Sequence, residues 1–358
     1  MMKNLVMGLC AAVFILHASC LISSCSPDDD LKGYVPNAAT IGIIQNGLLF
    51  TAQGNTATVE VETDVTASLD AAWCTATVSG RVVTVTAEPN SSFEGRTALL
   101  TLTAGEVCRT LPVQQLGMVL GTMPVSARHA PNDGDNFTYT IPHDMPMDVT
   151  TGEPWLHATL DGEQLHITVD ANDGGHIRRG NIVTESVGIR DTLTITQYDR
   201  YNDILGSYYM LGYLGGNTGQ PAAMRFDIVE RNDSLFMHLN TETGRYANTY
   251  VHVPFDEDTA TLTLLSAMTL YSQGSTTDTA YFYDTDGHIC TSRYAGASCR
   301  MYYAEQTGYN AARITPYNWP GHTIYGFVIR SSSIVTTTIL QLSNIVIMRV
   351  GPEGTKIS

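Results

Sequence analysis

The chain has 358 residues, with 19 basic residues against 35 acidic ones and a formal net charge of −16 at pH 7. This balance excludes proteins that bind nucleic acid or anionic membranes through a broad basic surface. Only 15% of the residues are charged, tyrosine and threonine are abundant, and helical periodicity is absent. The composition therefore favours an all-β protein, and the length suggests two or three domains.

The first 24 residues are expected to be an export signal. Residues 5–16 form an apolar run that is too short to cross a bilayer but suits the core of a signal peptide. The segment Ile-Ser-Ser before Cys25 resembles a bacterial lipobox, so Cys25 is the expected site of lipidation. Cys20 fits the motif less well, and a soluble secreted protein is the remaining alternative.

Residues 25–38 are expected to be a flexible tether behind the lipid. The acidic run Asp28–Asp30 resembles the surface-export signal of Bacteroidota lipoproteins. The alternative is a solvated acidic tether that has no role in export. Several acyl chains on one cysteine would anchor the chain stably. The expected location is the outer membrane, with the chain lipid-anchored and surface-exposed.

An internal repeat organises the next part of the chain. Residues 73–115 and 155–197 align without a gap at an offset of 82 residues. The matching positions include Trp73 and Trp155, Asn90 and Asn172, Arg96 and Arg178, and Gln115 and Gln197. A repeat of this length predicts two tandem copies of one domain, at residues 39–118 and 119–199.

Each copy is predicted to be a small β-sandwich. Residues 81–88 alternate between apolar and polar side chains, as a half-buried strand does. Gly80 and Gly162 follow a polar residue between two such runs, which is typical of a tight hairpin. Several short strands separated by turns predict an immunoglobulin-like β-sandwich in each copy.

The two copies resemble the BACON domain, a small β-sandwich of Bacteroidota surface and secreted proteins. The resemblance rests on the shared tryptophan, asparagine and arginine positions, the alternating strand, and the closing segments around Gln115 and Gln197. The family name implies carbohydrate binding, and many such domains look like spacers. Trp73 and Trp155 could stack on sugars, but we expect them to organise the packing of the sandwich, because they recur at one position of a duplicated fold.

The final segment, residues 202–358, is a different domain. It contains 14 of the 18 tyrosines and about eight strand-like runs separated by turn signals. This pattern predicts an antiparallel β-barrel or β-sandwich and does not decide between them.

Four cysteines remain once the signal and Cys25 are set aside: Cys74, Cys108, Cys290 and Cys299. Exported domains can form disulfides, and four cysteines allow three pairings. Domain membership selects Cys74–Cys108 and Cys290–Cys299 as the candidate disulfides. Free thiols are the alternative.

No enzyme signature is found, so we expect no catalytic residue, no cofactor and no metal. Asp256 and Asp258 could act as a glycosidase pair but lie in sequence typical of a turn. Residues 284–287 begin like a calcium loop, but His288 stands where an oxygen ligand would be needed, which favours a hairpin turn.

The best candidate for ligand binding is the loop at residues 314–322, which contains two prolines and a glycine. It presents Tyr317, Asn318, Trp319 and His322, and exposed aromatic rings beside polar groups suit both sugars and protein partners. The alternative is that Trp319 closes one end of the barrel.

These observations predict a non-catalytic surface lipoprotein that binds a glycan or glycoprotein, with the BACON-like domains as spacers. One alternative is a structural or adhesion subunit that binds a protein, and a remote one is an enzyme acting on glycosides. No nucleic-acid partner is expected, and the oligomeric state is left open.

Overall fold

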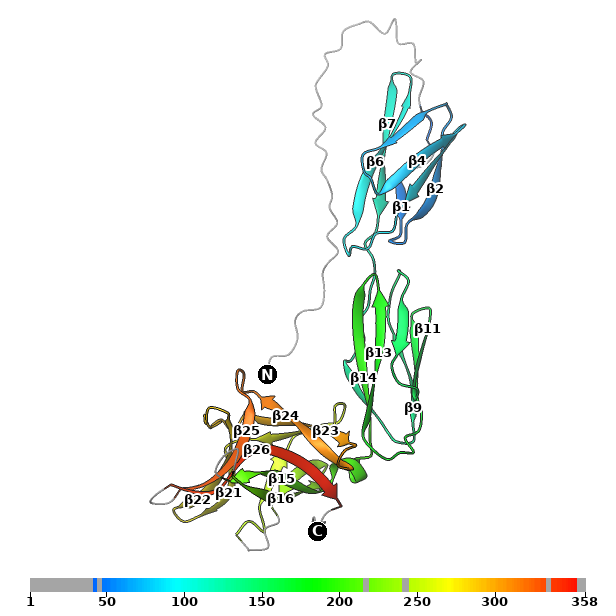
Figure 1. Ribbon diagram of the computed structural model, residues 1–358. Helices are drawn as coiled ribbons and strands as arrows, with labels where there is room; N and C mark the ends of the chain where they lie inside the picture. Colours follow the sequence, from blue (N-terminus) through cyan, green and yellow to red (C-terminus); the bar gives the residue numbers. More distant parts are fainter. Residues whose placement is uncertain (1–40, 44–46, 215–218, 240–244, 333–335, 353–358) are drawn as a thin grey trace, which may run out of the picture.

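The computed structural model describes residues 41–43, 47–214, 219–239, 245–332 and 336–352. It consists of two β-sandwiches and a β-barrel, arranged in chain order, with the barrel at an angle to the two sandwiches (Figure 1). In this part of the chain no helix is both long and apolar enough to cross a membrane. The expected signal, Cys25 and the tether lie outside the described residues.

The first sandwich packs a sheet in the order β1-β7-β6-β3 against a sheet in the order β2-β5-β4. Its strands are β1 (Leu48–Phe50), β2 (Asn55–Glu60), β3 (Thr66–Leu69), β4 (Cys74–Ser79), β5 (Val82–Ala87), β6 (Arg96–Ala104) and β7 (Val107–Gln115). Alternate side chains of β5 and β6 point inward, and Val83, Val85, Leu100 and Leu102 are buried completely. The period-2 pattern of the sequence therefore builds the core.

The second sandwich repeats this topology, with sheets in the orders β10-β13-β14-β8 and β11-β12-β9. Its strands are β8 (Ala127–Ala130), β9 (Asp135–Thr140), β10 (Asp148–Thr151), β11 (Leu156–Asp161), β12 (Gln164–Val169), β13 (Arg178–Ser186) and β14 (Ile189–Gln197). In both copies the first strand pairs in parallel with the last, as β1 with β7 and β8 with β14. All other pairs are antiparallel.

The residues shared by the two copies form one polar network in each sandwich. In the second copy, the Nε of Arg178 donates to Oε1 of Gln197 over 2.7 Å, and its guanidinium lies 4.3 Å from the centre of the Trp155 ring. The amide of Gln197 donates to the carbonyl oxygens of Pro131 and Asp170. The network thus ties the loop before β9 and the loop after β12 to the end of β14.

The first copy builds the same network from its own residues. The Nε of Arg96 donates to Oε1 of Gln115 over 2.8 Å, and the Arg96 guanidinium lies 4.6 Å from the centre of the Trp73 ring. The amide of Gln115 donates to the carbonyl oxygens of Thr51 and Glu88. Both tryptophans also pack against the sandwich cores. The repeated tryptophan, arginine and glutamine side chains therefore contact one another within each sandwich.

The third part is a nearly closed antiparallel β-barrel, which decides between the two predicted architectures. Its strands form one 12-stranded sheet in the described part of the chain. They are β15 (Gly206–Leu214), β16 (Gln220–Arg231), β17 (Ser234–His238), β18 (Tyr250–Val253), β19 (Phe255–Asp256), β20 (Thr261–Leu265), β21 (Met268–Gln273), β22 (Thr276–Asp284), β23 (Gly296–Ala304), β24 (Tyr309–Tyr317), β25 (Ile324–Ser332) and β26 (Thr337–Gly351). The predicted all-β fold class, with two tandem immunoglobulin-like sandwiches before this domain, is confirmed.

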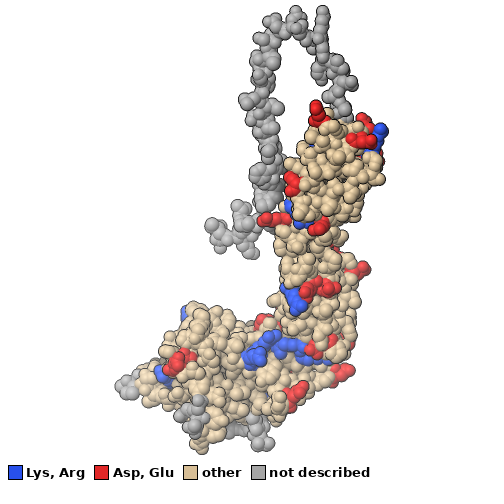
Figure 2. Space-filling model, turned by 45° about the horizontal axis from the view of Figure 1, so that its top comes forward, with Lys and Arg blue, Asp and Glu red and all other residues tan. Residues whose placement is uncertain are grey.

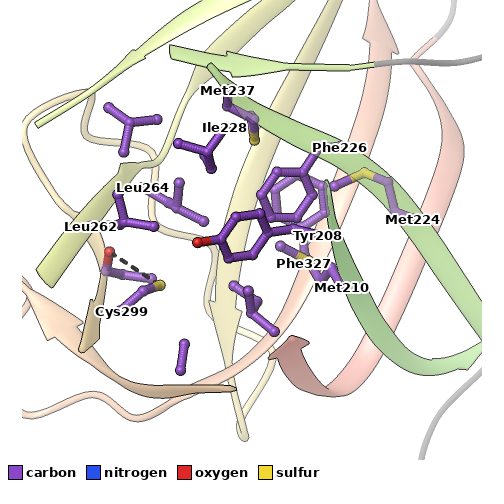
Figure 3. Packing of buried hydrophobic residues seen from close by; sticks show 14 of the residues in the cluster. Tyr208, Met210, Met224, Phe226, Ile228, Met237, Leu262, Leu264, Cys299 and Phe327 are labelled. Carbon is purple, nitrogen blue, oxygen red and sulfur yellow. Dashed lines mark hydrogen bonds between the residues drawn. The ribbon is translucent and has the colours of Figure 1, made fainter. Parts of the chain in front are cut away.

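The long strand β26 closes the barrel because it pairs with three others. Its first half pairs with β25, and its second half lies between β15 and β24. The interior is filled by buried apolar side chains, among them Tyr208, Phe226, Phe327 and the sulfur-containing Met237 (Figure 3). The barrel is thus a packed core.

The two expected disulfides are not formed, and all four cysteines are free thiols. Cys74 is buried on β4, whereas Cys108 is exposed on β7 of the other sheet, where its sulfur lies 3.4 Å from the hydroxyl of Thr103. Cys299 is buried in the barrel core, and its thiol faces the carbonyl oxygen of Ala297 (Figure 3). Membership of one domain is a poor criterion. The Cys108 side chain is exposed while that of Cys74 is buried, and Cys290, in the connection between β22 and β23, is buried outside the cluster that contains Cys299.

The second sandwich and the barrel share a packed junction around η1, a single π-helical turn at Arg200–Ile204. Ile177 and Tyr198 belong to the barrel's buried cluster, and the Tyr198 hydroxyl donates to the carbonyl oxygen of Glu257. Arg200 forms ion pairs with Glu230 and Glu257. Further contacts join His176 to Tyr303, the amide of His129 to Asp258, and Arg179 to the carbonyl oxygen of Thr259. The orientation of the barrel is therefore held by apolar and polar contacts together.

Candidate functional site

The candidate segment, residues 314–322, is only partly a loop. Residues 314–317 are the last four of β24, paired with β23, and residues 318–322 lie in the connection to β25, beside the hairpin that follows β22. The prolines and the glycine therefore predict the turn but place its start four residues too early.

Asp284 at the end of β22 pairs with Ile324 at the start of β25, which brings the two turns together. Nδ1 of His322 lies 2.6 Å from Oδ2 of Asp284, and Nδ1 of His288 lies 3.0 Å from the same oxygen. The backbone N–H of His288 donates to the other carboxylate oxygen. One carboxylate therefore organises both turns.

Asp284 is held in its ionised form. Its side chain is only 4% exposed, and burial alone would raise the pKa of the carboxyl. Hydrogen bonds with His322 and His288 outweigh this effect, so the pKa of Asp284 lies well below its usual range. The carboxylate thereby fixes the orientation of His322.

His322 in turn supports Trp319. The imidazole and the Trp319 ring are stacked, with 4.2 Å between their centres and 13° between their planes. Trp319 is half-buried but does not belong to the apolar cluster that fills the barrel, nor to the described side chains packed against it. The alternative, in which Trp319 closes the end of the barrel, would require the ring to pack against the barrel core, and it stacks on His322 instead.

Two exposed tyrosines lie in segments connected to this loop. Tyr317, the last residue of β24, is 39% exposed, and Tyr294 is 66% exposed. The Asn318 side chain donates to the carbonyl oxygen of Tyr294, which joins the loop to the segment before β23. Asn318 has a φ of 50°, a left-handed conformation that asparagine tolerates better than most residues. We call Tyr294, Tyr317, Asn318, Trp319 and His322 the aromatic end surface.

Asp284, His288 and His322 are the described residues that could hold a metal ion. Ligand atoms about 2.1 Å from a tetrahedral ion lie roughly 3.4 Å apart. The 2.6 Å between His322 Nδ1 and Asp284 Oδ2 is instead a hydrogen-bond distance. The three residues thus form a hydrogen-bonded triad in this conformation.

Of the four predicted site residues, Trp319 and His322 are stacked on each other, and Asn318 contacts Tyr294. Tyr317 precedes them at the end of β24. Asp284, His288 and Tyr294 are not predicted as site residues, and the predicted hairpin turn at Asp284 is confirmed. Asp284 and His288 lie at one turn and His322 lies at another. The sequence could have indicated this cluster only if the pairing of β22 with β25 had been known.

The triad should make the barrel sensitive to acid. Because the folded pKa of Asp284 is lowered, its stabilisation is complete above the unfolded pKa of about 4 and is lost as pH falls through the lower folded value. The thermal midpoint of the barrel in Asp284→Asn should therefore lie below that of the unaltered chain at pH 6, and the gap should narrow toward pH 3. Asp286→Asn, at an exposed neighbour, is the matched control. A gap that stays constant with pH would contradict this role.

Three comparisons place the chain among known proteins. The family model "BACON: Putative binding domain, N-terminal" matches residues 51–116 and 147–198. No curated protein matches the chain. The matched segments cover most strands of the two sandwiches and none of the barrel.

Similar solved structures include the I9–I11 tandem of titin, at 9% identity, covering 84% of this chain and 97% of that one with a TM-score of 0.32. Another is a three-domain I67–I69 variant of titin, at 7% identity, covering 85% and 98% with a TM-score of 0.27. An endo-fucoidan hydrolase from glycoside hydrolase family 107 is 11% identical over 43% of this chain and 33% of that one, with a TM-score of 0.24. At these levels of identity the likeness concerns the fold alone. The family match, together with the shared topology of the two sandwiches, identifies two BACON domains in the chain.

Proposed function

We propose that the protein is a non-catalytic, lipid-anchored surface protein of Bacteroidota type that binds a glycan or glycoprotein with the aromatic end surface of its barrel. The observation that carries the proposal is the supported ring of Trp319. Its stacking partner His322 is held by the Asp284 carboxylate, so the ring is oriented before any ligand arrives. Such preorganisation lowers the entropic cost of binding.

The neighbours of Trp319 suit a polyhydroxylated ligand. Tyr317 and Tyr294 are exposed, and the C–H faces of a sugar can stack on the Tyr317 ring and on the face of the Tyr294 ring that the Arg293 guanidinium does not cover. The amide of Asn318 and the imidazole of His288, whose side chain is 66% exposed, lie close enough to read hydroxyl groups. Apolar faces with a few placed polar groups are typical of small-ligand sites.

The two BACON domains serve as spacers in this proposal. Their repeated tryptophan, arginine and glutamine side chains are occupied by contacts within each sandwich. The expected lipid at Cys25 and the acidic tether stand at the other end of the chain from the barrel. The barrel would thus be presented away from the membrane.

The test is binding of the full chain, purified in detergent, on a glycan array and by affinity electrophoresis. Trp319→Ala is expected to weaken binding by about tenfold or more, because central aromatic residues carry much of the affinity of a binding surface. Phe93→Ala removes a ring that is 62% exposed on the first sandwich and should change nothing. Absence of binding to every glycan, or equal binding by Trp319→Ala, would overturn the proposal.

A second candidate is a structural or adhesion subunit that binds a protein. It is favoured by the same exposed tyrosines, since tyrosine is enriched at protein interfaces. This candidate predicts a partner captured by the full chain but not by Tyr294→Ala, with no affinity for free glycans.

A further inference from the structure

A cavity of about 420 Å³ lies at the corner between the second sandwich and the barrel. It is lined by Arg179 of β13, Arg300 of β23, Tyr302 of β23 and Arg313 of β24. Figure 2 shows that the largest basic area on the visible face lies at this corner. A chain with a net charge of −16 thus gathers three arginines at one place.

Neither barrel arginine forms an ion pair within the described residues, although the carboxylate of Asp256 lines an adjoining cavity. Arg300 and Arg313 are directly opposite each other on β23 and β24, where like charges are destabilising. In the described ranges neither side chain takes part in a hydrogen bond or an ion pair, and both are exposed to solvent. Their placement is therefore not explained by the folding of the barrel.

Arg179 brings a third charge from the sandwich. One of its terminal nitrogens donates to the carbonyl oxygen of Thr259 over 2.8 Å, which fixes the side chain against the barrel. Its Nε is buried and has no partner among the described residues. Burial, and then the charge of Arg300, lower the pKa of Arg179 to about 10. An anion at this position would relieve both effects.

A second cavity of about 470 Å³ adjoins the first and shares Arg300 and Arg313 with it. Hydroxyl groups dominate its other polar side chains, which are Ser126, Thr194, Thr259, Thr261, Ser298 and Thr315, with one carboxylate, Asp256. Hydroxyl and carboxylate oxygens accept hydrogen bonds from hydroxyl groups, and guanidinium groups bind oxyanions in a two-pronged geometry. The pair of cavities therefore matches a ligand that carries hydroxyls along its length and an oxyanion at one point.

We propose that this corner binds an acidic glycan, with the sulfate or carboxylate group held by Arg179, Arg300 and Arg313 and the neighbouring sugar hydroxyls in the adjoining cavity. The inference takes the class of ligand, a glycan, from the proposed function, but it concerns a surface separate from the aromatic end surface. A glycan fits better than a nucleic acid, because the basic area is confined to the corner and the rest of the chain carries excess negative charge. The sandwich and the barrel are both needed, since the sandwich contributes Arg179 and the barrel contributes Arg300 and Arg313.

The test compares polymers that share one backbone. The full chain should bind dextran sulfate but not uncharged dextran, and binding should weaken as salt is added. The double variant Arg300→Gln/Arg313→Gln should weaken binding by on the order of tenfold or more, because charge-assisted hydrogen bonds are lost. Polygalacturonate, which carries carboxylates, shows whether a sulfate ester is required.

The control removes the same charge elsewhere. Arg81→Gln/Arg330→Gln replaces two exposed arginines outside both cavities and should leave binding unchanged. The thermal midpoint of Arg300→Gln/Arg313→Gln should not fall, which would show that the loss of binding does not come from unfolding. Dextran sulfate binding that persists in Trp319→Ala separates this site from the aromatic end surface. Equal binding by the two double variants, or tighter binding of short single-stranded DNA than of dextran sulfate, would overturn the inference.

Discussion

Replacing Gln197 with leucine is expected to lower the free energy of unfolding of the second sandwich by about 3 kcal/mol. Gln197 is completely buried and accepts from Arg178 while donating to Pro131 and Asp170. Leucine has a similar size but leaves the Arg178 Nε and the Pro131 carbonyl without these partners. A buried polar group that is left without a partner destabilises the fold by more than a single hydrogen bond stabilises it.

Differential scanning calorimetry of the full chain measures this effect. A loss of this size in a small domain should lower one transition by on the order of 10 °C or more. Gln115→Leu should lower the transition of the first sandwich similarly, because Gln115 occupies the equivalent position. Gln164→Leu, on the exposed side of β12, is the control. A small effect at both buried glutamines would mean that the shared network is dispensable.

Tyr198→Ala is expected to uncouple the second sandwich from the barrel and to cost about 3 kcal/mol at their junction. The Tyr198 ring is 2% exposed, lies 4.3 Å from the ring centre of His129, and meets Phe255 edge-on. Its hydroxyl bonds Glu257 in the segment between β19 and β20. Truncation leaves a cavity where the two domains meet, and neighbouring groups cannot fill it without moving.

Small-angle X-ray scattering and calorimetry check this expectation. The variant should give a broader distribution of intramolecular distances, and its sandwich and barrel should unfold in more widely separated transitions. Tyr201→Ala removes a ring that is 69% exposed in the same turn and should do neither. An unchanged scattering curve for Tyr198→Ala would show that the other junction contacts, including the ion pairs of Arg200, hold the two domains without this ring.

The sandwiches were predictable because their information is local. Alternation along β5 and β12, with glycine turns at Gly80 and Gly162, predicts paired strands, and the ungapped repeat predicts two copies. The barrel was only half predictable. Strand alternation is the same in a sandwich and a barrel, and closure depends on how β26 divides its pairing among β15, β24 and β25.

The candidate site was predictable within one loop but not across loops. Prolines, a glycine and two aromatic residues predict a turn with candidate binding side chains at residues 314–322, and the structure starts this turn only after Tyr317. Asp284 is distant in sequence and reaches His322 only through the pairing of β22 with β25. The cavity lined by arginines could not be predicted from the sequence for the same reason, since Arg179 and Arg300 belong to different domains.

The parallel pairing of the first and last strands in each sandwich has a mechanical consequence. A pull between the first sandwich and the barrel acts on β8 from its start and on β14 from its end, and these parallel strands are joined over four residue pairs. The strands are then loaded in shear, so all their hydrogen bonds must stretch together instead of opening one after another. The same holds for β1 and β7 in the first sandwich. Two domains loaded in this way resist extension, so the part of the chain between the start of the first sandwich and the barrel keeps its length under tension.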